Sequence, residues 1–248
     1  MVDVVTRARD SRALEQRIET QKSSSLDLNK WIVEQLELSS RDTVLELCCG
    51  RGAQTQAISS VFDLKQYKAV DVSPESVDAV KALNLPDFVE VICSDANIYV
   101  EKETQDFDLV LCCYGFYYLQ KPLACLQAIK SNLLKSGGQL FLVGPSWGNN
   151  SLLFDILKKC DVAIPDFVFW SSEYFMGEAL SQLNSLFEEV IYKKITNYVE
   201  FSSSSEFLQY WKNTTFYSER HEKRVFEEMD MLEYPILLNK HVSSIKAR

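Results

Sequence analysis

The sequence predicts an α/β fold built on a mostly parallel β-sheet with helices on both faces. Short apolar runs of strand length alternate with stretches of helical periodicity between residues 41 and 145. Glycine-containing turns separate them, most clearly at Gly50–Gly52 and Gly137–Gly138. Strands that alternate with helices form βαβ units, whose right-handed crossovers give parallel strands covered on both sides.

The first predicted elements lead into the glycine turn. A helix is expected over Leu26–Leu38, where apolar residues recur every three or four positions. The apolar run Thr43–Cys49 predicts a buried strand that ends at Gly50, and Ala53–Phe62 predicts the helix after the turn.

The alternation then continues. Tyr67–Val72 is a predicted strand, and Ser73 suits the N-cap of the helix that follows, with Pro74 in its first turn. Ser76–Leu83 continues this helix. The remaining core elements are the strands Phe88–Cys93, Phe107–Cys113 and Gln139–Val143, and the helix Pro122–Leu134.

The pattern changes after residue 145, where helices dominate. Two β-like segments, Glu189–Ile195 and Asn197–Phe201, either pair with each other or form one bent strand. The predicted helices are Leu152–Cys160, Glu178–Leu186, Glu206–Tyr217 and Glu219–Leu232.

Composition favours a small-molecule substrate over nucleic acid. The formal net charge is -9, and the basic residues are scattered, whereas a nucleic-acid partner requires clustered Lys and Arg. The denser group is Arg7, Arg9, Arg12 and Arg17. No apolar run approaches the ~18 residues of a membrane span, and Met1–Arg17 lacks the apolar core of a secretory signal. We therefore expect no membrane partner and a cytoplasmic location; a homo-oligomer stays open.

The cysteines do not predict a metal site. The chain has 7 of them, including the adjacent pairs Cys48–Cys49 and Cys112–Cys113. Neighbouring strand residues point to opposite faces, whereas zinc ligands usually show C-x-x-C spacing. These thiols are interpreted as small buried apolar groups.

The glycine turn suits a nucleotide-like ligand or a plain tight loop. Gly50 and Gly52 permit a positive φ and a close approach of the backbone. A pyrophosphate-binding G-x-G-x-x-G requires a small third position, which is Thr55 here. Glu46, just ahead of the turn, repels a diphosphate and favours a ligand with ammonium and sulfonium groups.

Two aspartates follow the next strands. Asp71 ends the second strand, and a carboxylate there accepts both hydroxyls of a ribose, unless it is a strand-end cap. Asp95 follows the third strand, either as an adenine-amine acceptor or as a turn residue. The carboxyl ends of parallel strands open onto one crevice, so both aspartates are expected near the glycine turn.

Five segments, in this order and spacing, resemble the motifs of class I S-adenosylmethionine-dependent methyltransferases. They are VLELCCGRGAQT, AVDVSPESVDAV, CSDANIY, FDLVLCCYGFYYL and LKSGGQLFLVG, and they cover roughly residues 42–144. Each motif is loose by itself, whereas five in register are specific. One departure is Cys48, because the family usually has glycine there.

The resemblance implies a Rossmann-like sheet of seven strands in the order 3-2-1-4-5-7-6, with the last strand antiparallel. The two late β-like segments are then expected to supply strands six and seven. We expect one methyltransferase domain over residues 1–248. Its parts are a helical cap (1–40), a cofactor-binding core (41–145), and substrate-side helices with the final strand pair (146–248).

The resemblance also implies S-adenosylmethionine as the cofactor and assigns its contacts. Asp71 matches the ribose carboxylate, and Asp95 matches the adenine contact. Cys113 and Tyr114 match the wall near the methionine moiety. The complete expected set is Glu46, Cys48, Gly50, Gly52, Asp71, Val72, Asp95, Ala96, Cys113 and Tyr114.

Methyl transfer asks mainly for alignment, since the sulfonium methyl is already activated. Tyr114 and Tyr118 lie where the family places residues near the methyl group, and they are the expected positioning residues at the catalytic centre. The alternative role of Tyr118, as of Phe116, is packing of the next helix. Tyr117 and Trp147 are the expected contacts of an acceptor, predicted to be a small molecule with a hydroxyl or carboxylate oxygen.

Two other classes stay open from the sequence. The first is an NAD-dependent oxidoreductase, against which Glu46 and Thr55 argue. The second is a non-catalytic methyltransferase-like subunit that acts as a binding partner.

Overall fold

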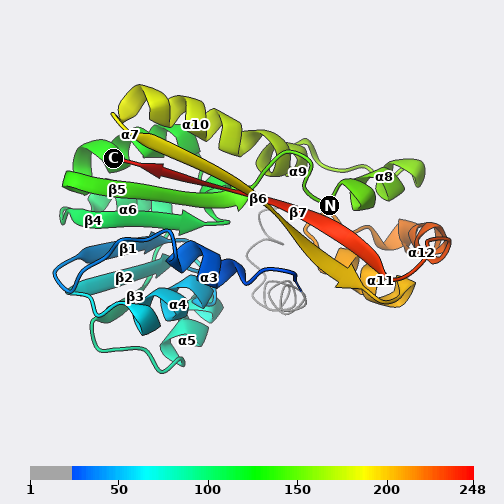
Figure 1. Ribbon diagram of the computed structural model, residues 1–248, viewed down its shortest axis with the longest axis horizontal. Coiled ribbons are helices and arrows are strands. Elements are labelled where there is room, and N and C mark those ends of the chain that lie inside the picture. The colour runs from blue at the N-terminus through cyan, green and yellow to red at the C-terminus, as the bar shows by residue number, and fades with distance from the viewer. Residues whose placement is uncertain (1–23) are drawn as a thin grey trace. The chain divides into compact units, whose positions relative to one another are not determined.

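A computed structural model describes residues 24–248 of the chain (Figure 1). The group Arg7–Arg17 lies outside these residues, and the single domain over 1–248 stays a prediction. The described residues divide into two compact units. The core unit comprises Leu28–Gly144, Met176–Lys193 and Ser243–Arg248, and the helical unit comprises residues 24–27, Pro145–Phe175 and Lys194–Val242.

A seven-stranded sheet has the order β3-β2-β1-β4-β5-β7-β6, as expected. Parallel pairing joins β1 to β2 and to β4, β2 to β3, and β4 to β5. The strands are β1 (Thr43–Leu47), β2 (Gln66–Asp71), β3 (Val89–Cys93), β4 (Phe107–Cys113), β5 (Leu134–Pro145), β6 (Val190–Phe201) and β7 (Ile236–Ala247).

The last strand, β7, runs against its neighbours, as its arrow shows in Figure 1. Just before β6 begins, Glu189 and Arg248 donate their backbone N–H groups to each other's carbonyl oxygens, at 3.0 and 2.9 Å. Such a reciprocal pair is typical of antiparallel strands. The expected fold, with strand order 3-2-1-4-5-7-6 and helices around the sheet, is confirmed.

Of the two alternatives for the late β-like segments, the single strand is confirmed, and the expectation that they supply strands six and seven is wrong. The segments Glu189–Ile195 and Asn197–Phe201 belong to one continuous strand, β6, and β7 is the unpredicted segment Ile236–Ala247. The polar residues in the middle of β7 break the alternation that marks a strand. It forms a strand because β5 and β6, on its two sides, supply hydrogen-bonding partners.

The helices of the core unit follow the predictions closely, with two exceptions. Ser73 caps α5 by accepting a hydrogen bond from Ser76 N at 3.3 Å. The helix α6 was not predicted. The elements are α3 (Leu28–Val33), α4 (Ala53–Val61), α5 (Pro74–Lys81), α6 (Ala96–Lys102), the 3-10 turn η1 (Phe116–Tyr118), α7 (Pro122–Asn132) and α10 (Phe175–Leu186).

The second exception is α3, which stops at Val33 although its apolar periodicity continues to Leu38. The chain beyond it is held by the C-terminal strand instead. Ser244 Oγ donates to Gln35 Oε1 at 2.9 Å, and Lys246 Nζ donates to the Gln35 carbonyl at 3.1 Å. Tertiary contacts therefore override the helical pattern.

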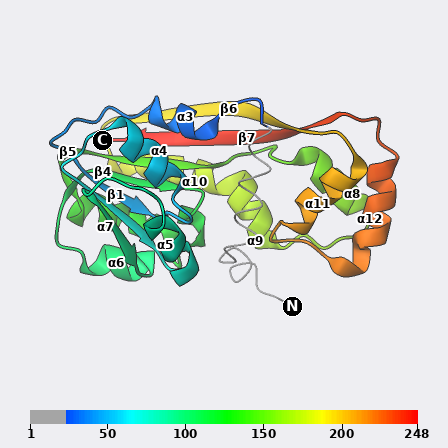
Figure 2. The same cartoon turned by 90° about the horizontal axis from the view of Figure 1, so that it is seen from below.

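Helices cover both faces of the core-unit sheet. The pair α3 and α4 lies on one face, and the pair α6 and α7 lies on the other (Figure 2). The central strand β1 is buried along its whole length. A parallel strand that is covered on both faces buries all of its side chains, which explains the near-continuous apolar runs in β1 and β4.

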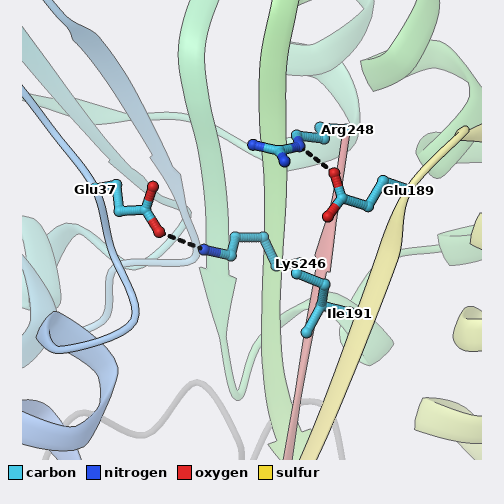
Figure 3. A pocket seen from close by; sticks show the side chains of 5 residues that line it. All are labelled: Glu37, Glu189, Ile191, Lys246 and Arg248. Carbon is cyan, nitrogen blue, oxygen red and sulfur yellow. Dashed lines mark hydrogen bonds and ion pairs between the residues drawn. The ribbon is translucent and has the colours of Figure 1, made fainter.

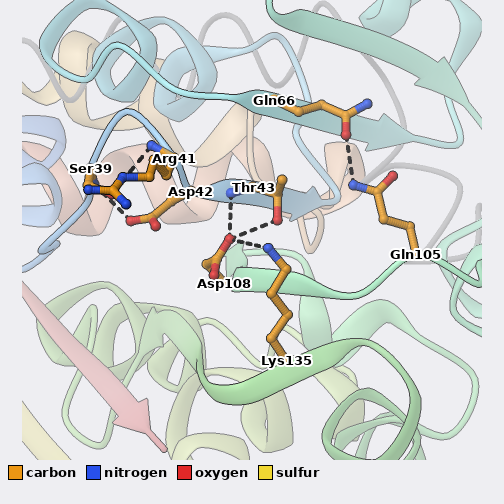
Figure 4. A network of polar contacts seen from close by, with 8 residues as sticks. All are labelled: Ser39, Arg41, Asp42, Thr43, Gln66, Gln105, Asp108 and Lys135. Carbon is orange, nitrogen blue, oxygen red and sulfur yellow. Dashed lines mark hydrogen bonds and ion pairs between the residues drawn. The ribbon is translucent and has the colours of Figure 1, made fainter.

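A polar network ties the amino ends of β1, β4 and β5 together (Figure 4). Asp108 accepts hydrogen bonds from Thr43 N at 2.7 Å, Thr43 Oγ1 at 2.9 Å and Lys135 Nζ at 2.6 Å. Burial raises the pKa of Asp108, but these donors outweigh it and lower the pKa overall. The network lies at the end of the sheet opposite the glycine turn, so its role is structural.

The helical unit has its own apolar core, which includes the fully buried residues Phe207 and Trp211. None of the helices within residues 24–248 is long and apolar enough to span a membrane. Its elements are α8 (Ser151–Lys159), α9 (Asp166–Phe169), the π-helical turn η2 (Trp170–Tyr174), α11 (Ser204–Lys212), the 3-10 turn η3 (Glu219–His221) and α12 (Glu222–Asp230).

Candidate functional site: the carboxyl ends of the parallel strands

In the loop after β1, every second residue is left-handed, and the chain turns there into α4. Gly50 and Gly52 have φ of 54° and 80°, and Cys48 has φ of 58° without being glycine. Gly52 is the N-cap of α4, and its N–H donates to the Cys49 carbonyl at 3.0 Å. The two glycines are needed for the turn, because a Cβ is unfavourable in this region.

Asp71, at the end of β2, is joined to this loop. Its Oδ2 accepts a hydrogen bond from Gly50 N at 2.8 Å, and its Oδ1 accepts one from Ser73 N at 2.9 Å. The carboxylate therefore fixes the glycine turn and the start of α5. An ionised carboxylate has about four acceptor positions, so these two bonds leave capacity for ligand hydroxyls.

Glu46 is 1% exposed, on β1. Both Thr55 Oγ1 and Tyr67 OH donate to its Oε2, the latter at 2.8 Å. Burial raises the pKa of Glu46 from 4.5 to about 7, against these two hydrogen bonds, which lower it, while Asp71 raises it further. Its carboxyl group is thus poised between the neutral and ionised forms near neutral pH.

The Cys48 side chain occupies the space that a side chain at Gly115 would need. A Cβ added to Gly115 would lie 2.3 Å from Cys48 Cβ, 3.0 Å from its sulfur and 3.3 Å from the sulfur of Cys112. No side chain fits at position 115 beside this cysteine. The extra β-carbon that the sequence places at position 48 is therefore accommodated by the absence of one at Gly115.

The segment after β4 carries the predicted aromatic residues. Tyr114 has φ of 58°, and its N–H donates to the Val143 carbonyl at 2.8 Å, which holds it to β5. Cys113 is buried just before it, and burial raises the pKa of its thiol. Tyr117 and Tyr118 form η1, with ring centroids 4.7 Å apart. Tyr117 is 7% exposed, so its ring is largely packed within the core unit.

The segment after β3 begins α6. Asp95 is its N-cap, and its Oδ1 accepts hydrogen bonds from Asn97 N at 2.8 Å and Asn97 Nδ2 at 2.7 Å. Ala96 is buried as the first helical residue, and Val72, beyond the end of β2, is half-buried. Asp95 is thus a helix N-cap, a role that the sequence did not assign to it, and the adenine contact stays a prediction.

Trp147 belongs to the helical unit and is 69% exposed. The same unit holds a polar cluster that the sequence reasoning missed. Gly148 N donates to Glu173 at 2.8 Å, and Lys194 Nζ donates to the Trp147 carbonyl at 3.0 Å. No motif marks this cluster, because its members come from separate elements.

His241 lies in the same cluster, on β7, and was not singled out in the sequence. Asn239 Nδ2 donates to Gly148 O at 2.9 Å and lies 3.0 Å from His241 Nε2. Since this amide nitrogen is a donor, Nε2 accepts, and Nδ1 carries the proton toward Thr196 Oγ1 at 2.9 Å. Burial, and then the charge of Lys194, lower the pKa of His241 below its ordinary value, which favours the neutral imidazole.

The core unit therefore joins Gly50 directly to Asp71. Gly52 and Cys48 lie in the same loop as Gly50, and Glu46 lies on the strand before it. The residues missed by sequence reasoning are Thr55 and Tyr67, which hold Glu46, and Gly115, which admits Cys48. Among residues 24–248, no group of three or more His, Cys, Asp or Glu side chains is arranged to hold a metal ion.

Solved structures with the same fold include methyltransferases. A putative methyltransferase from Bacillus halodurans is similar with a TM-score of 0.59 and 18% identity, over 89% of this chain and 98% of that chain. The putative methyltransferase in a Haloferax volcanii complex with the Trm112 methyltransferase activator has a TM-score of 0.60 and 15% identity, over 99% of this chain and 97% of that chain. These likenesses show that the fold is that of class I methyltransferases.

A geranyl diphosphate C-methyltransferase from Streptomyces coelicolor is similar with a TM-score of 0.51 and 15% identity, over 89% of this chain and 77% of that chain. No curated protein matches the sequence at a significant level. Residues 44–138 match the family model described as "Methyltransferase domain". Residues 44–138 therefore carry a methyltransferase domain, and S-adenosylmethionine is the methyl donor that this domain and the fold indicate.

Proposed function

We propose that this protein transfers the methyl group of S-adenosylmethionine to a hydroxyl or carboxylate oxygen of a small molecule. The observation that carries the cofactor part is the bond from Gly50 N to Asp71 Oδ2. It joins a glycine turn and an acidic strand end at one edge of the sheet. This combination suits a ligand with ribose hydroxyls and a cationic tail rather than a diphosphate.

In this proposal, different residues of the core unit bind the ribose, the adenine and the methionine end of the cofactor. Asp71 accepts the ribose hydroxyls with its remaining acceptor capacity, and Asp95 accepts the adenine amine, with Val72 and Ala96 beside the base. Glu46, once ionised, favours the positively charged methionine end. Cys113 and Tyr114 form the wall next to that end, since both follow β4 at the same edge of the sheet.

When bound, S-adenosylmethionine supplies an activated methyl group, so the protein's task is alignment. The phenols of Tyr114 and Tyr118 are suited to orient an acceptor oxygen, and aromatic faces stabilise a nearby cation. Tyr117 and Trp147 are proposed as acceptor contacts. An oxygen acceptor suits this residue set, because phenolic hydroxyls both donate to and accept from an alcohol or carboxylate.

The charge of the chain supports a small acceptor. At a net charge of -9, with its basic residues scattered, the protein repels a polyphosphate backbone. The similar enzyme from Streptomyces coelicolor is described in complex with geranyl diphosphate and S-adenosyl-L-homocysteine, so the fold accommodates small acceptors. The similarity is one of fold, and the choice of an oxygen atom depends on the tyrosines of this chain.

A methyl-transfer screen with isotopically labelled S-adenosylmethionine tests the proposal. The panel contains phenols, alcohols, carboxylic acids, amines and RNA, each with wild-type protein and with Asp71→Ala as the cofactor-deficient control. We expect label in phenols, alcohols or acids only. Label confined to amines or RNA contradicts the oxygen acceptor. Failure of the protein to bind S-adenosylmethionine or its demethylated product at about millimolar concentration contradicts the proposed activity altogether.

A further inference from the structure

The outer edge of the sheet is formed by β6, the last strand in the order. Within residues 24–248, the partners on this outer edge are Ser24 and Ser25. Ser24 forms a single bridge with Val199, and Ser25 N donates to the Tyr198 carbonyl at 2.9 Å. The first half of β6, from Val190 to Lys194, has no such strand partner in this part of the chain.

The backbone of β6 alternates in direction, and two contacts fix which residues point outward. Glu189 exchanges both backbone hydrogen bonds with Arg248, so its polar groups point toward β7. Tyr198 binds Ser25, so its carbonyl points to the outer edge. Both contacts indicate the same alternation. The backbone N–H and C=O groups of odd-numbered residues point toward β7, and those of even-numbered residues point to the outer edge. Val190, Tyr192 and Lys194 therefore present their N–H and C=O groups at the open edge.

The sequence along this edge is self-complementary when read antiparallel. Residues 188–194 read EEVIYKK, with two acids, three central residues and two lysines. If a second copy pairs antiparallel with Ile191 opposite Ile191, Glu188 lies opposite Lys194 and Glu189 opposite Lys193. Val190 then lies opposite Tyr192, and these two outward-facing residues exchange both backbone hydrogen bonds. Opposite charges directly across a strand pair are stabilising.

Neighbouring registers lack this match. If one strand slides by a single residue against the other, each residue whose backbone groups point outward lies opposite one whose backbone groups point toward β7. The backbone hydrogen bonds between the two copies are then lost. Centring the pair on Lys193 places that lysine opposite itself, and like charges directly opposite destabilise the pair. Centring it on Tyr192 leaves every one of the four charges without an opposite charge. The register centred on Ile191 is the one that satisfies both backbone and charge.

The side chains along this stretch are accessible. Ile191 is 39% and Tyr192 41% exposed, and Glu188 and Lys193 are exposed without an ion-pair partner among the described residues. Figure 3 shows Ile191 lining a pocket together with Lys246 and the Glu189–Arg248 ion pair. A long edge strand with exposed apolar groups is a template for strand pairing.

We propose that the protein forms a homodimer in which the β6 strands of two copies pair antiparallel about Ile191. The pairing joins the two sheets into one continuous sheet. It closes as a two-fold interface, because each copy presents the same strand to the other. The paired charges make the dimer sensitive to salt, since exposed ion pairs are screened.

The oligomeric state of the full chain tests the backbone part. Light scattering after size exclusion is expected to give twice the 28.5 kDa mass of the chain. Tyr192→Pro removes one outward-facing N–H and no backbone hydrogen bond to β7, so it is expected to give the monomer. It also loses the side-chain hydrogen bond between Tyr192 OH and Ser243 Oγ of β7, and the Tyr192→Ala control loses the same bond. Tyr192→Ala is the matched control: it loses the same side chain, keeps the N–H, and is expected to stay dimeric.

A charge swap tests the register. Glu188→Lys places a lysine opposite Lys194 and is expected to raise the dimer dissociation constant about tenfold. Adding Lys194→Glu restores opposite charges in every pair and is expected to restore the dimer. A wild-type protein that is monomeric up to about 0.1 mM overturns the proposal. So does a Tyr192→Pro variant that dimerises as well as wild type, or a double variant no tighter than the single one.

Discussion

The Asp71 carboxylate and the Gly50 backbone N–H are hydrogen-bonded at 2.8 Å, although they belong to different strand–loop units. The same carboxylate accepts a hydrogen bond from Ser73 N at 2.9 Å. One side chain therefore sets the shape of the glycine turn and the start of α5. A ligand that also binds this carboxylate is coupled to both.

Replacement of Asp71 by alanine is expected to weaken binding of S-adenosylmethionine at least tenfold. The substitution removes the proposed ribose acceptor and frees the Gly50 N–H, so the turn loses its fixed shape. Isothermal titration calorimetry with the cofactor and its demethylated product measures the effect. Asp78→Ala is the control, because Asp78 is an exposed residue on α5. Unchanged affinity in Asp71→Ala contradicts the ribose assignment.

Binding of the cofactor is expected to strengthen with pH through the titration of Glu46. The pKa of this carboxyl group is about 7. Below that pH it is neutral and does not attract a cation; above it the ionised form does. If binding requires the ionised form, affinity rises about tenfold from pH 6 to pH 8, with release of one proton. Titrations in two buffers of different ionisation enthalpy count that proton.

Glu46→Gln is the control for this pH effect. It keeps an acceptor for Thr55 and Tyr67 but does not titrate. Its affinity is expected to be low and to lack the rise between pH 6 and pH 8 seen in wild type. An equal pH dependence in both proteins would assign the effect to the ligand or to another group.

The contact between Gly115 and Cys48 predicts a destabilising substitution with a specific rescue. Gly115→Ala places a Cβ 2.3 Å from Cys48 Cβ, so the two strand ends must move apart. We expect a loss of about 1–3 kcal/mol in the free energy of unfolding, as for other overpacked sites. Denaturant unfolding followed by circular dichroism measures it.

The rescue is Cys48→Gly, which removes both the Cβ and the sulfur. Because Cys48 has φ of 58°, glycine also relieves about 1 kcal/mol of backbone strain. The double variant is expected to be as stable as wild type. If the change in unfolding free energy of the double variant equals the sum of the changes in the two single variants, the two residues are not in contact.

Glu103 is expected to make the core unit acid-sensitive. Burial raises its pKa, but donors from Lys68, Tyr99 and two backbone N–H groups outweigh burial and lower it to about 2. A carboxyl group whose pKa is lower in the folded state stabilises the fold above its unfolded pKa near 4.5. This contribution is lost as pH falls from 4.5 toward 2.

Glu103→Gln tests this contribution. It is expected to cost about 2 kcal/mol of unfolding free energy at pH 7, from the weakened charged hydrogen bonds. The difference from wild type is expected to shrink as the pH falls below 4.5. Glu101→Gln, at an exposed position on α6, is the control and should change little at either pH.

Trp147→Ala is expected to raise the KM for the acceptor several-fold and to leave the affinity for S-adenosylhomocysteine unchanged. The reason is that this residue is proposed as an acceptor contact and lies outside the cofactor-binding residues. Met231→Ala provides a matched control, since Met231 is likewise 69% exposed and in the helical unit. A lower affinity for S-adenosylhomocysteine together with an unchanged KM for the acceptor would contradict the assignment.

Most strands and helices of the core unit follow from local sequence. Phe107–Cys113 has the predicted bounds of β4, and Ser73 caps α5 as predicted. The helix α6 escaped prediction because its seven residues are too few to show periodicity. Its start was nevertheless marked by Asp95, an N-cap residue type that the sequence reasoning weighed as a ligand contact or a turn residue.

The sequence by itself determined the alternation of strands and helices, the glycine turn and the acidic residues at strand ends, because these depend on neighbours along the chain. The tertiary structure decided which residues meet. In the folded chain, Tyr67 donates a hydrogen bond to Glu46, Gly115 lies against Cys48, and the strand Ile236–Ala247 lies between β5 and β6. Such contacts join residues distant in sequence, and they depend on packing and strand pairing that no local pattern records.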